Sequence, residues 1–290
     1  MKIVVIGADG QLGSDLCRVL EGKNIVPLSH HEIEVVDFEG VREVLTEHGP
    51  DMVINTAAYH LVDRCEDHVR EAFEVNAYGA RNLALICRER DIPLVHLSTD
   101  YVFDGRKQIP YREEDVPGPL SAYATSKLAG EYFIQALLPR HFIIRSCGLY
   151  GIEGAKGRRN NFVETMLRLA GEEKEIRVVD DQIVTPTSTW DLARKIVELI
   201  RTDGYGLYHI TNGGECSWYG FARTIFQQAG LRPDLQPTTS EAFGTRARRP
   251  AYSVLENGRL RRLGMDDVQD WREALAAYLE EREEIIGLRS

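Results

Sequence analysis

Three glycines near the start of the chain constrain its fold more than any other feature. Gly7, Gly10 and Gly13 stand where a short β-branched run gives way to the hydrophobic spacing of a helix. Glycines at such a turn permit a tight bend, let the backbone approach a pyrophosphate and let the helix pack closely on the sheet. The sequence therefore predicts a dinucleotide site that also includes Gln11 and Leu12, with a plain tight turn as the alternative.

Predicted strands and helices alternate along the first half of the chain. Strands are expected at residues 3–6, 24–28, 52–55, 94–97 and 142–144, and helices at 13–20, 39–47, 71–90 and after Ser121. This alternation is typical of an α/β fold with a doubly wound parallel sheet, the Rossmann arrangement. We predict a dinucleotide-binding domain from residues 1–150 and 183–212. A smaller, mostly C-terminal α/β substrate lobe is expected from residues 151–182 and 213–290.

Composition excludes several classes of protein. The formal charge of −10 and the pI near 5.4 argue against a surface for nucleic acid or for an anionic membrane. No apolar stretch approaches the ~20 residues of a membrane span, and the N-terminus lacks the features of a signal peptide. Five scattered cysteines without a Cys-x-x-Cys pair predict neither a disulfide framework nor a zinc site. We therefore expect reduced thiols and a cytoplasmic protein.

The end of the second predicted strand bears on the choice of cofactor. In a Rossmann unit, an acid about 20 residues along binds the ribose 2′-hydroxyl of NAD. Here the strand is followed by Ser29, His30 and His31, so we expect Ser29 to contact the cofactor and the site to favour NADP(H), with NAD(H) left open. Asp37 and Phe38 are expected to cover the adenine, although Asp37 equally suits a helix cap.

Small residues follow the third predicted strand. Ala57, Ala58 and Tyr59 would let a cofactor lie against the backbone, and the alternative is tight packing of a strand on a helix. Asn76, inside a long helical pattern, is a candidate to bond backbone groups near the site, with a satisfied structural asparagine as the alternative.

Tyr123 and Lys127 are the strongest candidates for catalysis. Four residues apart on a predicted helix, they lie on one face with about 6 Å of axial rise between them. A phenol is a poor acid–base catalyst at neutral pH, but a cation held close favours the phenolate and brings the pKa toward the working range. Thr99 follows a buried strand and would lie at its carboxyl end, where open α/β sheets bind ligands. These three side chains would converge on a carbonyl group, whereas Tyr-x-x-x-Lys alone also occurs as an ordinary exposed pair.

The order and spacing of the glycine turn, Thr99 and the Tyr123/Lys127 pair resemble those of extended short-chain dehydrogenases/reductases. Within that family the chain is most similar to the dTDP-4-dehydrorhamnose reductases, over nearly its whole length. The stretches that carry this likeness are residues 10–13, 98–105, 160–162, 214–219, 249–255 and 270–275.

The resemblance implies a role for each catalytic candidate. Tyr123 would give its proton to the new C4 hydroxyl, Lys127 would hold the nicotinamide ribose and lower the pKa of Tyr123, and Thr99 would hydrogen-bond the ketone. Asp100 and Tyr101 would contact the sugar. Related 4,6-dehydratases carry Asp-Glu at these two positions, so Tyr101 favours simple reduction.

The resemblance also implies the substrate. The expected reaction is the NAD(P)H-dependent reduction of the C4 ketone of a nucleotide-linked 4-keto-6-deoxysugar. The first substrate expected is dTDP-4-dehydro-L-rhamnose. Asn161, Arg249 and the basic segment after residue 150 are expected to bind the diphosphate, or else to form a surface basic cluster. Gly148 stands where these reductases usually carry a Trp that stacks on the sugar. We therefore expect a more open pocket at this position, and the resemblance does not specify the sugar or the nucleotide.

Two other readings stay open. One is another sugar-nucleotide reductase, epimerase or dehydratase, and the other is a non-catalytic regulatory subunit that binds NADP. The partner expected is a small nucleotide sugar. No metal is predicted, and the oligomeric state, a homodimer included, is left open.

Overall fold

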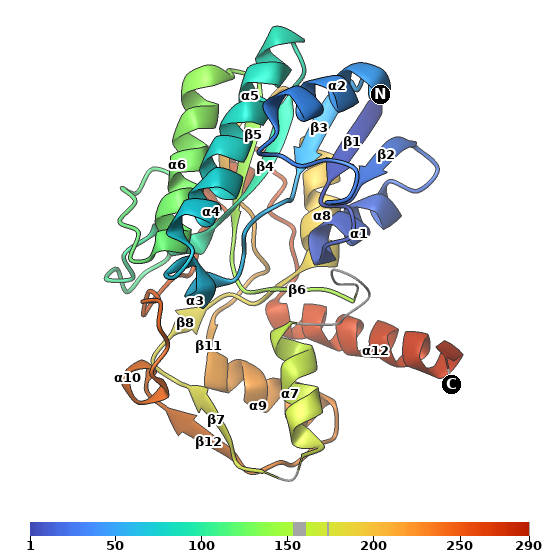
Figure 1. Ribbon diagram of the computed structural model, residues 1–290. Coiled ribbons are helices and arrows are strands. Elements are labelled where there is room, and N and C mark those ends of the chain that lie inside the picture. Colours follow the sequence, from blue (N-terminus) through green and yellow to red (C-terminus); the bar gives the residue numbers. More distant parts are fainter. Residues whose placement is uncertain (153–160, 173, 290) are drawn as a thin grey trace.

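The computed structural model describes residues 1–152, 161–172 and 174–289 (Figure 1). Residues 153–160, which hold most of the basic segment expected to bind a diphosphate, lie outside the described residues. Within the described ranges, no helix combines the length and the apolarity needed to cross a bilayer. The same residues contain no group of three or more His, Cys, Asp or Glu side chains placed to hold a metal ion.

A parallel sheet forms the frame of the larger domain, in the strand order β2-β1-β3-β4-β5-β10. Its strands are β1 (Lys2–Ile6), β2 (Asn24–Leu28), β3 (Met52–Asn55), β4 (Leu94–Thr99), β5 (His141–Ser146) and β10 (Gly206–His209). Their runs of aliphatic residues are mostly buried, as expected for parallel strands covered on both faces. The chain passes from β2 back across β1 to β3, which is the reversal of a doubly wound sheet. The predicted fold class is confirmed.

Helices cover both faces of this sheet (Figure 1). On one face α1, α8 and α11 share a core with the strands, and on the other face α2, α5 and α6 do so. Their bounds are α1 (Gln11–Val19), α8 (Thr189–Leu199), α11 (Gly258–Arg262), α2 (Phe38–His48), α5 (Ala80–Glu89) and α6 (Ala122–Leu137). Ser121 caps α6, because its hydroxyl oxygen accepts a hydrogen bond from the Ala124 N–H at 3.2 Å. The predicted start of this helix is therefore correct.

The long helix predicted over residues 71–90 is interrupted. The structure has α4 (Val69–Phe73), a π-helical turn (Glu74–Gly79) and then α5. Asn76 lies in the turn and bonds both backbone groups of Tyr59, accepting from its N–H at 2.9 Å and donating to its carbonyl at 3.2 Å. A β-carbon on Gly130 of α6 would lie 2.3 Å from the Asn76 carbonyl oxygen. The π-helical turn thus allows Asn76 to contact Tyr59 and Gly130. The spacing of hydrophobic residues, from which the helix was predicted, does not report such contacts.

A second core lies below the sheet in Figure 1. It is built from α7 (Phe162–Ala170), α9 (Trp218–Gln228), α12 (Trp271–Arg289), β7 (Ile176–Val179) and β12 (Leu235–Thr238). The shorter elements are α3 (Val62–Cys65), α10 (Ser240–Phe243), β6 (Leu149–Tyr150), β8 (Ile183–Val184), β9 (Thr187–Ser188) and β11 (Cys216–Ser217). The division into two lobes stays a prediction, with one correction. Leu260 and Met265 pack into the core of the sheet, so the residues around α11 do not belong with the smaller lobe.

One buried ion pair joins three elements of the larger domain. Glu131 of α6 and Arg145 of β5 are both buried, with Arg145 Nη2 2.6 Å from Glu131 Oε2. Ser98 of β4 donates its hydroxyl to the same carboxylate. A buried carboxylate is tolerated only when it is paired and hydrogen-bonded, so these contacts fix how α6 docks on the sheet.

Removing one partner of this pair should destabilise the fold strongly. We expect Glu131→Ala to lower the free energy of unfolding by about 3–5 kcal/mol, because Arg145 would remain buried without its counter-charge. The double substitution Glu131→Leu with Arg145→Met should recover much of that loss, since neither charge remains. Urea denaturation of both variants measures this, and a single variant as stable as the parent would contradict it.

Candidate active site

The glycine turn follows β1 where the strand order reverses. Gly7 has a φ of +79°, in the left-handed region that favours glycine. A β-carbon on Gly13 would lie 2.1 Å from the Gly7 carbonyl oxygen, so α1 can begin this close to β1 only with glycine there. Among the described residues no side chain caps the helix at Gly10. The first N–H groups of α1, from Gln11 and Leu12, are therefore available to an anion.

An acid lies at the end of β2, where the sequence interpretation found none. Ser29 donates its backbone N–H at 2.6 Å and its hydroxyl at 2.8 Å to the Glu32 carboxylate. The backbone hydrogen bond from Ser29 is the main cause of the lowered pKa of Glu32, so this carboxylate is ionised at neutral pH. The Ser-x-x-Glu spacing, familiar from capping boxes, was the signal that could have revealed it.

Asp37 and Phe38 begin the next helix. The Asp37 carboxylate accepts from the Gly40 N–H at 3.1 Å and caps α2. The Phe38 ring lies against the Arg42 guanidinium, 4.8 Å from ring centroid to Arg42 Cζ. The capping role foreseen for Asp37 is thus present, and a contact of either residue with an adenine stays a prediction.

The loop after β3 runs directly beside the glycine turn. A β-carbon on Gly7 would lie 2.7 Å from Thr56 Oγ1 and 3.0 Å from the Ala57 nitrogen. Ala57, Ala58 and Tyr59 are partly exposed, and Asn76 holds the backbone of Tyr59. The structure therefore brings together the two segments predicted to lie along a cofactor.

Thr99 and Tyr123 meet at the carboxyl end of β4. Thr99 is the last residue of the strand; its hydroxyl oxygen accepts from the Tyr101 N–H at 3.2 Å, and its hydroxyl donates to Asp100 Oδ1 at 3.1 Å. Burial raises the pKa of the Tyr123 phenol, the adjacent Thr99 hydroxyl lowers it, and the Asp100 charge raises it further. The phenol therefore keeps its proton at neutral pH, which is the state a proton donor needs.

Asp100 holds the Thr99 hydroxyl in place. Its second oxygen accepts a hydrogen bond from the Cys147 thiol at 3.0 Å. Burial raises the pKa of Asp100 to about 6, while hydrogen bonds from Ser253, Cys147 and Thr99 act in the opposite direction. At neutral pH the carboxylate is mostly ionised and holds the hydroxyl hydrogen of Thr99.

Tyr101 and Arg249 extend the site toward the smaller lobe. The Tyr101 ring stands edge-on to the Tyr123 ring, with 6.1 Å between centroids. Arg249 lines the same cavity as Tyr101 and pairs with Asp63 on α3, with 2.7 Å between Nη2 and Oδ2. The guanidinium is thereby fixed next to the residues predicted to contact a sugar.

Lys127 faces the strand beneath it rather than Tyr123. The side chain is 2% exposed, and its Nζ donates to the Leu97 carbonyl at 2.6 Å and lies 3.4 Å from His96 Nε2. Burial lowers the pKa of Lys127 to about 8, against the opposing charge of Glu131. Lys127 is not among the groups that shift the pKa of Tyr123. Burial is the main cause of the raised pKa of the phenol, and a lowering of it by Lys127 stays a prediction.

Sequence reasoning missed His96. It is 1% exposed in β4, with Nδ1 3.1 Å from Asn55 Nδ2 and the other ring nitrogen facing Lys127. A single histidine inside an apolar strand reads as ordinary core. Its partners are 41 and 31 residues away in the sequence, so no local spacing signals the contact.

A cavity of about 500 Å³ opens beside Tyr101 and Arg249. Phe162 and Trp218 of the second core, together with Phe243, supply aromatic surface along its wall. The ring centroids of Phe162 and Trp218 are 4.7 Å apart. Such a cavity suits a small molecule with a planar ring at one end and an anionic group near the guanidinium.

Asn161 and Gly148 lie outside the lining of this cavity. Asn161 caps α7, accepting from the Glu164 N–H at 3.0 Å and donating to the Gly151 carbonyl at 2.8 Å. A diphosphate would therefore have to displace one of these bonds to reach its amide. Gly148 has a φ of +57°, which favours glycine. The open pocket expected at Gly148 is not seen there, because the cavity lies elsewhere.

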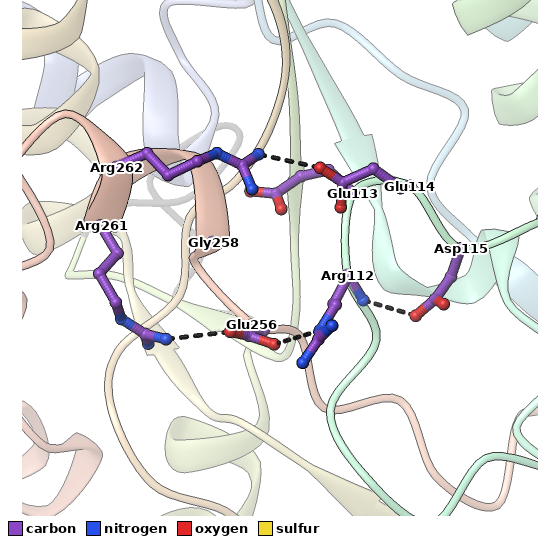
Figure 2. A pocket seen from close by; sticks show the side chains of 8 residues that line it. All are labelled: Arg112, Glu113, Glu114, Asp115, Glu256, Gly258, Arg261 and Arg262. Carbon is purple, nitrogen blue, oxygen red and sulfur yellow. Dashed lines mark hydrogen bonds and ion pairs between the residues drawn. The ribbon is translucent and has the colours of Figure 1, made fainter.

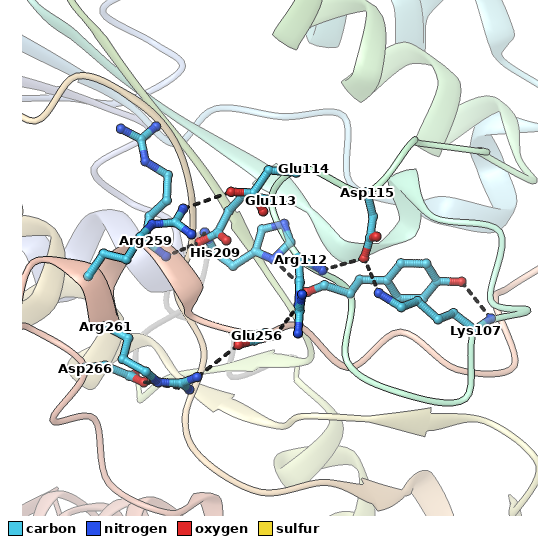
Figure 3. Close-up of polar contacts among 12 residues, drawn as sticks. Lys107, Arg112, Glu113, Glu114, Asp115, His209, Glu256, Arg259, Arg261 and Asp266 are labelled. Atoms are coloured by element: carbon cyan, nitrogen blue, oxygen red, sulfur yellow. Dashed lines mark hydrogen bonds and ion pairs between the residues drawn. The ribbon is translucent and has the colours of Figure 1, made fainter.

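A larger hollow of about 680 Å³ has a structural role (Figure 2). Charged side chains of the loop before α6 and of α11 line it, and Arg112 Nε bonds Glu256 Oε2 at 3.0 Å across it. Figure 3 shows Glu113 above this pair, next to Arg259, whose N–H donates to the Glu113 carboxylate at 2.8 Å. The network fastens the loop that leads into α6, and no residue predicted for the site lines the hollow.

Known proteins resemble this chain over nearly its whole length. The family described as "RmlD substrate binding domain" matches residues 1–284. The spore coat polysaccharide biosynthesis protein SpsK of Bacillus subtilis is 41% identical over 283 residues, which cover 97% of this chain and 98% of that protein. The dTDP-4-keto-6-deoxy-D-glucose reductase of Streptomyces niveus is 40% identical over 276 residues, or 94% of each chain.

Solved structures agree with the sequence comparison. The dTDP-4-dehydrorhamnose reductase of Bacillus anthracis, solved in complex with NADP, has a TM-score of 0.92 and 39% identity to this chain. The match covers 97% of this chain and 99% of that one. Family, sequence and fold thus confirm the predicted resemblance, and the chain belongs to the RmlD substrate binding domain family.

Proposed function

We propose that the chain is an NADPH-dependent reductase that converts dTDP-4-dehydro-L-rhamnose to dTDP-L-rhamnose. The observation that carries this proposal is the meeting of Thr99 with a protonated Tyr123 beside a cavity that begins at Tyr101 and Arg249. The names of the relatives support it, because they describe reductases of dTDP-linked 4-keto-6-deoxysugars, one of them solved with NADP.

The residues around the glycine turn fit a dinucleotide. The tight approach of Gly13 to Gly7 leaves no side chain between the backbone and a ligand, and the uncapped start of α1 offers N–H groups to a pyrophosphate. Ser29 and the loop from Ala57 to Tyr59 flank this turn and would hold the rest of the cofactor. Bound there, NADPH supplies the hydride.

The chain's own residues handle the ketone and the proton. Thr99 orients the C4 ketone, and Tyr123 gives its phenolic proton to the oxygen as negative charge develops there. A ketone that approaches Thr99 competes with Asp100 for the hydroxyl hydrogen. Lys127, charged below about pH 8, adds positive charge beneath the site.

The cavity accounts for the remainder of the substrate. Arg249 and Tyr101 line this cavity, and we expect the guanidinium to bind the diphosphate and the Tyr101 side chain to contact the sugar. The paired rings of Phe162 and Trp218 offer a surface on which a thymine can stack. A homodimer remains a prediction.

Substrate-dependent oxidation of NADPH tests the proposed reaction. The ketosugar can be generated from dTDP-glucose with the preceding enzymes, and the loss of reduced-nicotinamide absorbance should match the dTDP-L-rhamnose formed. An epimerase or a dehydratase returns its hydride and would give no net oxidation. Binding of NADPH without turnover would point instead to a different ketosugar or to a regulatory binder.

Replacing the proton donor should stop turnover and spare cofactor binding. We expect Tyr123→Phe to lower kcat by roughly 10²-fold or more, because the phenolic proton assigned to the ketone oxygen is removed. The affinity for NADPH, measured by calorimetry, should change little. Tyr78→Phe, at an exposed tyrosine, is the matched control. A Tyr123→Phe enzyme with near-normal kcat would refute the assignment.

Activity should fall at alkaline pH. The pKa of Lys127 is lowered to about 8, so the positive charge is present below that pH and is lost as the pH rises through it. We therefore expect kcat to decline above about pH 8. A Lys127→Arg enzyme, which stays charged, should retain a lower activity without this decline. A wild-type profile that is flat well above the pKa of Lys127 would argue against the role of its charge.

Glu32 should limit the preference for NADPH over NADH. Its carboxylate lies at the end of β2 and would repel a 2′-phosphate bound there. We expect Glu32→Gln to raise the ratio of kcat/KM for NADPH to that for NADH by roughly tenfold. Glu34→Gln, at a nearby acid that pairs with His30, is the control. Equal ratios in the parent and Glu32→Gln enzymes would place the ribose elsewhere.

A further inference from the structure

Asn55, His96 and Lys127 form a buried row of side chains beneath the proposed reaction site. Asn55 ends β3, His96 lies in β4 and Lys127 projects from α6. All three are buried, and each lies within 3.4 Å of the next. The function proposed above uses Lys127 and leaves the other two without a role.

A backbone group fixes the orientation of the Asn55 amide. The Ala57 nitrogen lies 3.1 Å from Asn55 Oδ1. Because a backbone N–H can only donate, the atom that faces it must be the amide oxygen. The amide nitrogen of Asn55 therefore faces His96 Nδ1, at 3.1 Å, and donates to it.

This donation selects the tautomer of His96. Burial lowers the pKa of His96 well below its ordinary value, and a charge on Lys127 lowers it further, so the ring is neutral with either form of Lys127 and has one N–H and one bare nitrogen. With Nδ1 accepting from Asn55, the hydrogen is on Nε2 and points at Lys127 Nζ, 3.4 Å away. An ammonium group offers only hydrogens to this N–H, whereas a neutral amine offers a lone pair.

The opposite arrangement breaks a contact. If Nε2 were bare and accepted from the ammonium, Nδ1–H would need the oxygen of Asn55. The amide nitrogen would then face the Ala57 N–H, and two donors would oppose each other in a buried position. The contact between His96 and Lys127 is therefore a hydrogen bond only when Lys127 is neutral, whereas the charged form leaves two donors facing each other and is disfavoured.

We propose that His96 is a positioning residue that presents an N–H to Lys127 and so lowers the affinity of this amine for its proton. Its consequence for catalysis rests on the reductase function proposed above, whereas the effect on Lys127 itself does not. A lower proton affinity of Lys127 lowers the pH above which kcat is expected to decline.

Burial also lowers the proton affinity of Lys127, whereas the other side chains around the pair do not. Glu131, one turn along α6, favours the charged form of Lys127 and is itself paired with Arg145 at 2.6 Å. The Leu97 carbonyl accepts a hydrogen bond from either form of Nζ. Burial disfavours the charge in any case, so the specific contribution of His96 has to be measured by substitution.

Titration of Lys127 by NMR tests the proposal without any activity assay. The chain has seven lysines, so protein labelled with ¹³C-lysine gives few Cε signals, and Lys127→Arg identifies the one of interest. In His96→Phe, a ring of similar size without nitrogens, we expect the midpoint of Lys127 to rise by roughly one pH unit, the size expected of one buried hydrogen bond. The alkaline decline of kcat should move with it.

His141→Phe is the matched control. His141 is another buried histidine, on the neighbouring strand β5, and its ring bonds the Leu138 carbonyl at 2.5 Å. Its replacement should leave the midpoint of Lys127 unchanged. An unchanged or lower midpoint in a folded His96→Phe protein would overturn the proposal.

A second variant keeps the test decisive if His96→Phe does not fold. Asn55→Asp has the same shape but accepts from Nδ1, which moves the ring hydrogen away from Nε2 and leaves a bare nitrogen for the ammonium. The added carboxylate charge also favours the ammonium, so both effects should raise the midpoint of Lys127, and an unchanged midpoint would overturn the proposal. A wild-type protein without reductase activity would refute the proposed function and leave this titration valid.

Discussion

The carboxylate of Glu131 holds together the elements that carry the proposed reaction site. It is buried in α6 and receives hydrogen bonds from Ser98 on β4 and Arg145 on β5. Because a carboxylate without such partners is costly to bury, α6 can dock in only one way. That docking sets Tyr123 against Thr99. The reaction geometry thus depends on a polar contact inside the core rather than on the loops around the cavity.

Features fixed by neighbours in the sequence could be predicted. The spacing of Gly7, Gly10 and Gly13 predicted a turn whose close approach of helix and strand is present. Ser121 caps α6 as expected, and Thr99 ends its strand at the edge of the sheet where Tyr123 arrives. Each of these features is caused by residues close together in the sequence, through a backbone conformation or the start of a helix. The fold class could be predicted from the alternation of strands and helices.

Features that depend on distant partners could not be predicted. The pair between Arg249 and Asp63 joins residues 186 positions apart, and the contact of His96 with Lys127 appears only once β4 and α6 are packed. The direction of the Lys127 side chain could not be predicted either, because its Nζ bonds the Leu97 carbonyl of a strand 30 residues away in the sequence. A sequence pattern identifies which residue types are present, whereas the protonation state of a side chain depends on the groups that surround it in the folded protein.

Hydride transfer to C4 of the sugar is the step on which the assigned roles of Thr99, Tyr123 and Lys127 depend. It can be followed with NADPH that carries deuterium at the transferable position of the nicotinamide and with dTDP-4-dehydro-L-rhamnose as the acceptor. NMR of the product should show dTDP-L-rhamnose with deuterium at C4 of the sugar and nowhere else. Deuterium at another carbon, or a product without deuterium, would contradict the proposed reaction.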